Sequence, residues 1–481
     1  MHWSFPEMIR LFSDEYRSSM LSEGNFGVER ESQRVNYSGD LALTPHPSVF
    51  GDKFENPRIT TDFSESQIEM ITPPLKSAEE VYKALNDINN EVKNALKGEL
   101  LWPLSMPPRL PKEEDIPVAQ FPDTEDGRQK QIYRNGLALR YGKKMQMISG
   151  IHYNFSFSDK MIDFIYRQLR IEKTKRQFID EMYFSLTRNF LRYHWILIYL
   201  FGASPICDST YNSVIFKELE KIEKCCPHCA GKIKNFNRYA TSLRVSRFGY
   251  SDTDEKKYTV YFNSLREYET KIKKMMETES NKYSKLGIYK DGVQIQLNGN
   301  LLQSESEFYA PIRFKRNIKK GETQLTALVN RGVEYIEIRI LDVNPFDKVG
   351  ISVEQMNFLQ VFNVFCLFEE SKSIDEEQME RINTNHQLAA LLGRNEDLML
   401  YKYNDDSRIP LKNFGDEIFE KLRIVAKLMD KDNVEKKYSE SVESEYKKLH
   451  NIELLPSERI CREMDNDNRS YIQFGMEYAE A

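Results

Sequence analysis

Polar and apolar residues alternate along several segments of the chain with the two-residue period of a β-strand. The segment 24–35, GNFGVERESQRV, sets Glu29 and Glu31 on one side of the pleat, where a strand facing the core would carry apolar residues. The same alternation predicts further strands at 67–72, 150–158, 293–300 and 334–344. The acidic side chains on the polar sides of these predicted strands therefore need an explanation.

The polar sides of the predicted strands carry residue types that bind ligands. They include Glu69, His152, Asn154, Ser156, Gln294, Gln296, Asn298, Glu337 and Arg339. For any single strand, an antiparallel sheet with one solvated face would give the same alternation. A solvated face usually carries Lys and Thr, however, whereas this set has almost no Lys. We therefore expect the polar faces to converge on one cavity.

Apolar residues spaced by three or four positions predict helices. The predicted helices cover 77–97, 178–200, 354–371 and 434–449. In the first of them, Ser77 followed by Glu80 predicts a capping box at the start. The stretch 251–282 is charged and weakly patterned, and we expect it to be a mobile insertion or lid.

Composition excludes several classes of function. The chain has 481 residues, of which 40% are hydrophobic and 30% charged, so it can bury a large core. Its net charge of −6 gives no basic excess for nucleic acid or for an anionic membrane. The N-terminal segment lacks the apolar core of a signal peptide, and the apolar run 195–203 is too short to span a bilayer. We therefore expect a cytoplasmic enzyme.

Six cysteines in a chain of this length do not predict a disulfide framework. The segment 225–232, CCPHCAGK, contains a CxxC formed by Cys226 and Cys229, with Cys225 beside it. A structural zinc site normally needs a second ligand pair, and the sequence offers no matching CxxC, CxxH or HxxxH. An exposed, reduced loop is the favoured interpretation, and a zinc or redox role is the alternative.

Convergence of the polar faces would bring Glu29, Glu31, Glu69 and Glu337 together. Each pair of carboxylates at about 4 Å would repel by about 4 kcal/mol at an effective dielectric constant near 20, so such a cluster must hold cations. Carboxylates with one imidazole form a hard ligand set that suits Mg²⁺ or Mn²⁺. Arg339 beside Glu337 adds a group that binds phosphoryl oxygens, which points to phosphoryl transfer without any P-loop or kinase motif.

Long blocks of the sequence resemble one enzyme family. They are GVERESQRV, ITTDFSESQIEMITP, LWPLSMPP, YRNGLALRYGKKMQMISGIHYNFS, ATSLRVSRFGY and RGVEYIEIRILDVNPF. In order and spacing they resemble the bacterial monofunctional glutamate-cysteine ligases, from about residue 10 to the terminal LLPSERICREM. The segment CCPHCAGK matches none of the family's motifs.

The resemblance implies an α+β fold related to glutamine synthetase, with a mainly antiparallel, funnel-like sheet surrounded by helices. Residues 1–481 would form a single catalytic domain. ATP would phosphorylate the side-chain carboxylate of L-glutamate, and the amine of L-cysteine would then attack to give gamma-glutamylcysteine, ADP and phosphate. A separate glutathione synthetase would act downstream, because no ATP-grasp domain is fused to the ligase-like region.

The resemblance also implies roles for individual residues. The Mg²⁺ ligands would be Glu29, Glu31, Asp62, Glu69, His152 and Glu337, and Arg339 would neutralise the transferring phosphoryl group. The cysteine pocket would be formed by Tyr133, Leu137, Ile148, Tyr250 and Tyr309, and glutamate would contact Arg134, Gln146 and Arg244. For the pocket residues, plain core packing is the alternative. For the whole chain, a ligase for a different amine and a catalytically silent nucleotide-binding regulator are the alternatives.

Overall fold

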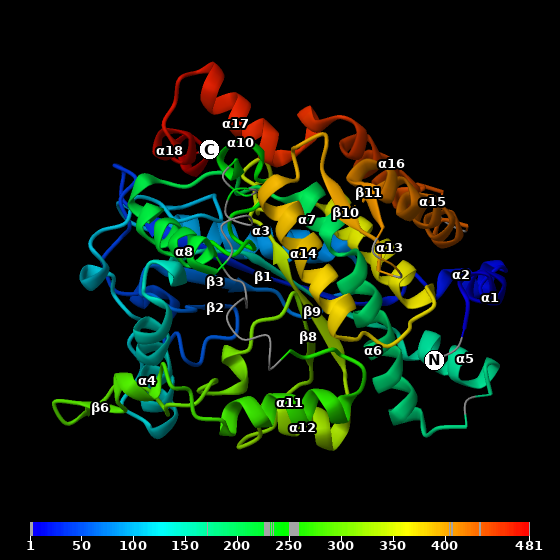
Figure 1. Ribbon diagram of the computed structural model, residues 1–481, viewed down its shortest axis with the longest axis horizontal. Helices are drawn as coiled ribbons and strands as arrows, with labels where there is room; N and C mark the ends of the chain where they lie inside the picture. The colour runs from blue at the N-terminus through cyan, green and yellow to red at the C-terminus, as the bar shows by residue number, and fades with distance from the viewer. Residues whose placement is uncertain are drawn as a thin grey trace.

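A mainly antiparallel sheet lies at the centre of the molecule with helices around it (Figure 1). This computed structural model describes residues 3–170, 172–225, 231, 233, 235–249, 259–403, 405, 407–431 and 434–480. The sheet has seven strands in the order β2-β3-β1-β5-β9-β8, and β4 pairs with β1. Their bounds are β1 Gly24–Val35, β2 Ile59–Thr60, β3 Gln67–Ile71, β4 Leu100–Leu101, β5 Ile151–Phe157, β8 Ile312–Lys315 and β9 Tyr335–Leu341. The predicted α+β class with an antiparallel sheet is confirmed.

The register of the strands gathers the polar residues on one face. Glu29 pairs with His152, Glu31 with Glu69, and Asn154 with Glu337. Residues directly opposite one another in an antiparallel pair point to the same side. The register of β5 against β9 shifts between Ile151 and Tyr153, next to His152. A bulge of this kind changes the direction of nearby side chains and is common beside active sites.

The apolar face of the sheet is covered by helices. Helix α3, Ala78–Ala95, packs on β1 and β3, and its N-cap Ser77 accepts a hydrogen bond from the backbone of Glu80. Helix α13, Val353–Phe368, packs against α3 and α6 and is buried from Gln355 onward. Both helices were predicted from apolar spacing. The predicted helix 178–200 is divided at His194 into α6, Lys175–Tyr193, and α7, Trp195–Phe201.

The remaining elements complete the shell around the sheet. They are α1 Phe5–Leu11, α2 Glu15–Ser19, α4 Glu125–Tyr141, α5 Asp159–Gln168, α8 Asn212–Cys225, α10 Phe236–Tyr239, α11 Leu265–Glu277, α12 Gln324–Arg331, α14 Glu376–Leu392, α15 Leu411–Met429, α16 Lys437–His450, α17 Pro456–Asn466 and α18 Tyr471–Glu480. Two separate strand pairs are β6 Tyr289–Lys290 with β7 Val293–Gln294, and β10 Met399–Tyr401 with β11 Arg408–Pro410. The α16 helix matches the prediction for 434–449. None of the described helices is long and apolar enough to cross a bilayer.

Two sequence predictions do not hold for the described residues. Of the strand predicted at 293–300, only β7, Val293–Gln294, is extended, and it pairs with β6, Tyr289–Lys290, rather than with the central sheet. Within the predicted mobile stretch 251–282, of which residues 259–282 are described, Leu265–Glu277 form the amphipathic helix α11, which buries Tyr268, Ile272 and Met275. Residues 250–258, Cys226, Cys229 and the side chain of Cys225 lie outside the described part of the chain.

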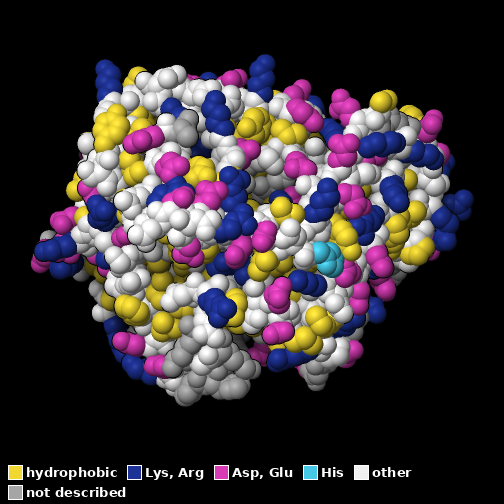
Figure 2. All heavy atoms as spheres, turned by 90° about the horizontal axis from the view of Figure 1, so that it is seen from above, with side chains coloured by type: hydrophobic (Ala, Val, Ile, Leu, Met, Phe, Trp, Pro, Cys, Tyr) yellow, Lys and Arg dark blue, Asp and Glu magenta, His cyan; other side chains and the backbone are white. Residues whose placement is uncertain are grey.

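The outer surface mixes charges of both signs. On the face shown in Figure 2, Lys and Arg side chains are interspersed with Asp and Glu side chains and with scattered apolar groups. This distribution accords with the small net charge of −6. The acidic side chains of Glu29, Glu31, Glu69 and Glu337 lie instead on the polar face of the sheet.

Candidate active site

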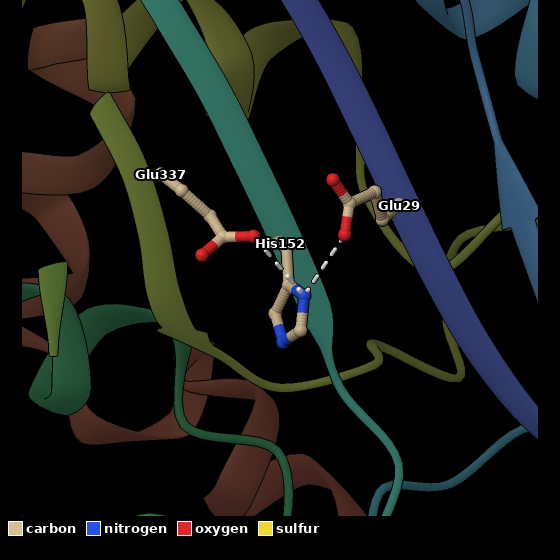
Figure 3. A group of neighbouring side chains, drawn as sticks. All are labelled: Glu29, His152 and Glu337. Atoms are coloured by element: carbon tan, nitrogen blue, oxygen red, sulfur yellow. Dashed lines mark hydrogen bonds and ion pairs between the residues drawn. The ribbon is translucent and has the colours of Figure 1, made fainter. Parts of the chain in front are cut away.

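Carboxylates and one imidazole meet on the polar face of the sheet, where β1, β5 and β9 lie side by side. Glu29 Oε2 lies 3.2 Å from His152 Nδ1, and Glu337 Oε1 lies 3.9 Å from the same nitrogen. Figure 3 shows the two carboxylates pointing toward the ring from the flanking strands. The three side chains offer ligand atoms within 4.8 Å of one another. This geometry suits one small cation.

A second group shares the same imidazole. His152 Nε2 lies 3.9 Å from Glu31 Oε1, and Glu69 completes a set whose ligand atoms again lie within 4.8 Å of one another. Asp62 belongs to neither of the two groups found among the described residues. Burial raises the pKa of Glu31 and of Glu69, and the nearby Asp62 carboxylate raises both further. Asp62 therefore lies at the edge of the cluster.

The two ends of the cluster differ in their balance of charge. At the β9 end, burial opposes ionisation of Glu337, but Lys315, Arg339 and His152 hold its pKa well below the ordinary value. At the β3 end, burial raises the pKa of Glu69 well above the ordinary value, and neighbouring carboxylates raise it further. Negative charge is thus in excess at the β3 end, where a divalent cation would offset it. The oxygen-rich donor set fits Mg²⁺ or Mn²⁺.

Cationic side chains face Glu337 from two strands. Arg339 Nη1 lies 3.2 Å from Glu337 Oε2, and Lys315 Nζ lies 3.2 Å from Oε1. Arg313 is the register partner of Glu337 on β8. Burial, together with the charge of Arg339, lowers the pKa of Arg313 to about 10. The predicted pairing of Arg339 with Glu337 on one face is confirmed, and the cluster has a positive half as well as a negative one.

Arg313 and Lys315 are not among the residues predicted from the sequence. The signal for them is the alternation in 311–315, PIRFK, where Ile312 and Phe314 are buried and the two cations point the other way. The strand is only four residues long and does not stand out by length. The expectation that the polar face has almost no Lys is not met at this strand, because Lys315 lies directly against Glu337.

The residues predicted to contact the acceptor lie next to this cluster on two segments. Tyr133 and Leu137 are partly buried on α4, and Tyr309 follows the short 3₁₀ helix Glu305–Glu307. Burial raises the pKa of both tyrosines, and the charge of Arg313 acts in the opposite direction on both, so both hydroxyls lie within electrostatic range of this guanidinium. Ile148 is fully buried in the core, and Tyr250 lies outside the described residues.

The residues predicted to contact glutamate come from three segments of the chain. Arg134 on α4 donates to the backbone carbonyl of Asp62, and Gln146 is buried in the 3₁₀ turn Met145–Met147. Arg244 Nη2 donates to the carbonyl of Arg339 at 2.9 Å, and Nη1 lies 3.9 Å from Oδ1 of the buried Asp342, while Nε and Nη1 are buried and make no hydrogen bond in the structure. A buried guanidinium with unused donors suits an anionic substrate.

Arg244 can reach this position because residue 150 is a glycine. A Cβ atom at Gly150 would lie 1.9 Å from Arg244 Nη2, so any other side chain would displace the guanidinium. The backbone nitrogen of Gly150 also donates to Glu31 Oε2 at 2.8 Å. Gly150 therefore brings a candidate substrate-binding cation close to the carboxylate cluster.

Comparison with known proteins shows the family of the chain. The family model described as glutamate-cysteine ligase matches residues 9–389. The chain is 38% identical over 462 residues to a glutamate-cysteine ligase of Alcanivorax borkumensis, covering 95% of this chain and 86% of that protein. The chain belongs to the glutamate-cysteine ligase family. The predicted family and the enzyme class, a ligase, are thereby confirmed.

Solved structures of the ligase family share the fold. A Francisella tularensis glutamate-cysteine ligase in complex with AMP superposes with a TM-score of 0.84 and 34% identity, covering 95% of this chain and 88% of that one. A bifunctional glutathione synthetase from Pasteurella multocida gives 0.75 and 29% identity, and the chain spans 52% of it. The chain also spans 56% of a bifunctional glutathione biosynthesis protein of Clostridium perfringens, at 36% identity. The fold is of the glutamine-synthetase-like class.

Proposed function

We propose that the chain uses ATP to join the side-chain carboxylate of L-glutamate to the amine of L-cysteine, forming gamma-glutamylcysteine, ADP and phosphate. The observation that carries this proposal is the pairing of a buried carboxylate-imidazole cluster with Arg339 and Lys315 on one sheet face. Family membership supports the reaction, and the AMP complex of the Francisella tularensis relative supports an adenine nucleotide as co-substrate.

The metal that we propose is Mg²⁺, with Mn²⁺ as a substitute. Two groups of residues would hold it: Glu29, His152 and Glu337 on one side, and Glu31, Glu69 and His152 on the other, with Asp62 at the edge. When bound, such ions would supply positive charge that offsets the negative charge of the phosphates during transfer. The raised pKa of Glu69, caused by burial and by neighbouring carboxylates, supports a requirement for added positive charge.

Cationic side chains would provide further positive charge for phosphoryl transfer. Arg339 presents a planar fork of donors, and Glu337 holds it against the cluster at 3.2 Å. We propose that Arg339 binds the transferring phosphoryl group and that Lys315 assists it from β8. The buried donors of Arg244 that make no hydrogen bond, Nε and Nη1, would hold a carboxylate of glutamate, with Arg134 and Gln146 contributing.

The amine approaches from the side of α4. We propose that Tyr133, Leu137, Ile148, Tyr250 and Tyr309 form the acceptor pocket, in which apolar walls accept a small side chain and hydroxyls bind the carboxylate. After attack on the acyl phosphate, the nitrogen must lose a proton. Asp62, which acts electrostatically on both Glu69 and Tyr133, lies between the cluster and α4 and is the group that we propose accepts it.

The setting of the reaction is also a proposal. One core runs from Trp3 to Phe474, which supports residues 1–481 acting as a single catalytic domain. ATP and a reduced thiol substrate point to the cytoplasm, where thiols are kept reduced. A separate glutathione synthetase would add glycine to the product next, and the bifunctional relatives support this order of steps.

The acceptor panel is the direct test of this function. With ATP, Mg²⁺ and L-glutamate held constant, L-cysteine and its methyl isostere L-2-aminobutyrate should both support ADP release, because the amine reacts and the thiol does not. An apolar pocket separates such isosteres by only about 1–3 kcal/mol. Alanine should be poorer, and bulky or charged amines much poorer. The dipeptide is confirmed by its mass.

A different outcome would identify a different ligase. If cysteine and aminobutyrate both fail while methylamine or ammonia supports turnover, the proposed acceptor is wrong and the phosphorylation half of the proposal stands. If no amine increases ADP release and no product forms, the proposed reaction is wrong as a whole.

Tyr309→Phe tests the acceptor pocket. We expect the KM for cysteine to rise about tenfold, the scale of one lost hydrogen bond to a charged group, with the KM for glutamate unchanged. Tyr250→Phe is predicted from the sequence to behave in the same way. Initial rates at varied cysteine provide the measurement, with Tyr446→Phe on α16 as the matched control. An unchanged KM for cysteine would mean that the Tyr309 hydroxyl does not hold the acceptor.

A further inference from the structure

A buried ion pair joins the two walls of the proposed acceptor pocket. One wall is α4, which carries Tyr133, and the other is the irregular segment 296–309, which ends in Tyr309. Arg140 on α4 pairs with Glu307 at 3.1 Å, and the two side chains are 0% and 1% exposed. Neither residue has a role in the proposed reaction, although Arg140 lies in the block YRNGLALRYGKK that carries the family resemblance.

Every nitrogen of the Arg140 guanidinium binds the opposite wall. Nε donates to Gln296 Oε1 at 3.0 Å, Nη2 to the carbonyl of Asn298 at 2.6 Å, and Nη1 to Glu307. The fixed planar fork of arginine therefore imposes one geometry on three points of the segment. Lysine, with a single nitrogen, could not reproduce these contacts.

Glu307 is held equally firmly. Its Oε1 accepts a hydrogen bond from Tyr141 on α4 at 2.8 Å, and its Oε2 accepts one from the backbone nitrogen of Gln303 at 2.5 Å. Two residues further along the chain is Tyr309. The position of Tyr309 relative to α4 is thus set by a carboxylate that is bound from both sides.

A second link reaches the other tyrosine. Gln303 Nε2 donates to the carbonyl of Tyr133 at 3.4 Å, and its Oε1 accepts from the backbone nitrogen of Leu297 at 3.1 Å. Gln303 can lie there because residue 136 is a glycine, since a Cβ atom at Gly136 would come 1.9 Å from Gln303 Oε1. Tyr133, Gly136 and Arg140 recur at three or four residues and so share one face of α4.

We propose that the Arg140–Glu307 network is a positioning device that sets the separation of Tyr133 and Tyr309, and through it the affinity and selectivity for the acceptor amino acid. The inference rests on the proposed acceptor pocket. A buried ion pair contributes little net stability, because desolvation offsets the attraction, so fixing a geometry is the better account of its presence. The carboxylates and His152 lie on β1, β3, β5 and β9, whereas the network joins α4 to the segment 296–309. Arg313 on β8 links the two, because it donates to the carbonyls of Ser306 and Phe308 beside Glu307. We therefore expect the network to affect the KM for cysteine much more than phosphorylation of glutamate.

Glu307→Gln is the first test. It keeps the shape of the side chain but removes the charge that binds Arg140. We expect the KM for cysteine to rise about tenfold or more, the scale of a small misplacement of binding groups. The kcat at saturating cysteine should stay within about threefold, and the KM values for ATP and glutamate within about twofold. The ratio of kcat/KM for cysteine over alanine should fall.

Glu445→Gln on α16 is the matched control. Glu445 is also a buried carboxylate in an ion pair, 2.7 Å from Lys448 and 2% exposed, but it is remote from the pocket. Both variants should lower the melting temperature, and only Glu307→Gln should change the KM for cysteine. If the two variants lose stability alike and neither changes that KM, the network only stabilises the fold and the proposal is wrong.

Gly136→Ala is the second test and covers the case in which Glu307→Gln does not fold. Alanine favours helix over glycine, so α4 itself is not weakened, while the new methyl group displaces Gln303 from Tyr133. The KM for cysteine should rise without loss of the folded protein. An unchanged KM for cysteine would overturn the proposal. If the wild-type protein makes no product with cysteine, the proposed function is wrong. Failure of the proposed function can therefore be distinguished from failure of the positioning proposal.

Discussion

Glu337→Gln should lower the rate of gamma-glutamylcysteine formation by at least about two orders of magnitude, the scale of lost preorganised electrostatics. The carboxylate contacts Arg339 and Lys315 at 3.2 Å and His152 at 3.9 Å. Glutamine keeps the size and one acceptor oxygen, but it removes the charge that holds two cations and a proposed metal ion. The residue is buried, and the substitution adds no volume, so the fold should remain intact.

The measurement is kcat at saturating substrates over a range of Mg²⁺ concentrations. We expect the Mg²⁺ concentration for half-maximal activity to rise as well, because a ligand is lost. Glu334→Gln, which changes a partly exposed carboxylate just before β9, is the matched control and should keep activity near that of the wild type. Near-normal turnover of Glu337→Gln at saturating Mg²⁺ would remove Glu337 from the proposed metal site.

Much of the site could be predicted from the sequence because a strand encodes its own two faces. In β1 and β9 the two-residue period alone places Glu29 with Glu31 and Glu337 with Arg339, and the structure has both arrangements. The period cannot supply the register between strands, which is set by contacts far apart in the sequence. That register, together with the shift beside His152, is what turns separate polar faces into one cluster.

The wrong prediction at 293–300 has a physical cause. Gln296 and Asn298 alternate with apolar residues as they would in a strand, but Gln296 binds Arg140 on α4 and the backbone carbonyls of Tyr283 and Gly287. The partners of these polar side chains lie on distant segments, so the local pattern is the same whether the chain is a strand or a braced loop. A strand differs from a braced loop in the number of residues that pair with a neighbouring strand. In this segment only two residues pair.

Helix predictions depended less on distant contacts. The apolar stripe of α3 and the continuous apolar run of α13 contain enough residues to define a buried face without reference to the rest of the fold. In α11 the stripe of Tyr268, Ile272 and Met275 was hidden by its many charged neighbours. The sequence of an amphipathic helix with many charged residues resembles that of an unstructured segment if the charge content is considered before the spacing of the apolar residues.

Arg339→Lys should lower kcat by roughly one to two orders of magnitude, the scale of a lost preorganised donor, and should raise the KM for ATP much less. Burial opposes the charge of Arg339, but Glu337 and Glu31 hold its pKa above the ordinary value, so a full positive charge faces the cluster. Lysine keeps that charge and loses the planar fork, which separates the two contributions. Initial rates at varied ATP give kcat and KM, and Arg316→Lys, near the edge of the same sheet but paired with Glu334, is the control. If only the KM for ATP changes, Arg339 binds the nucleotide in the ground state and does not stabilise the transferring phosphoryl group.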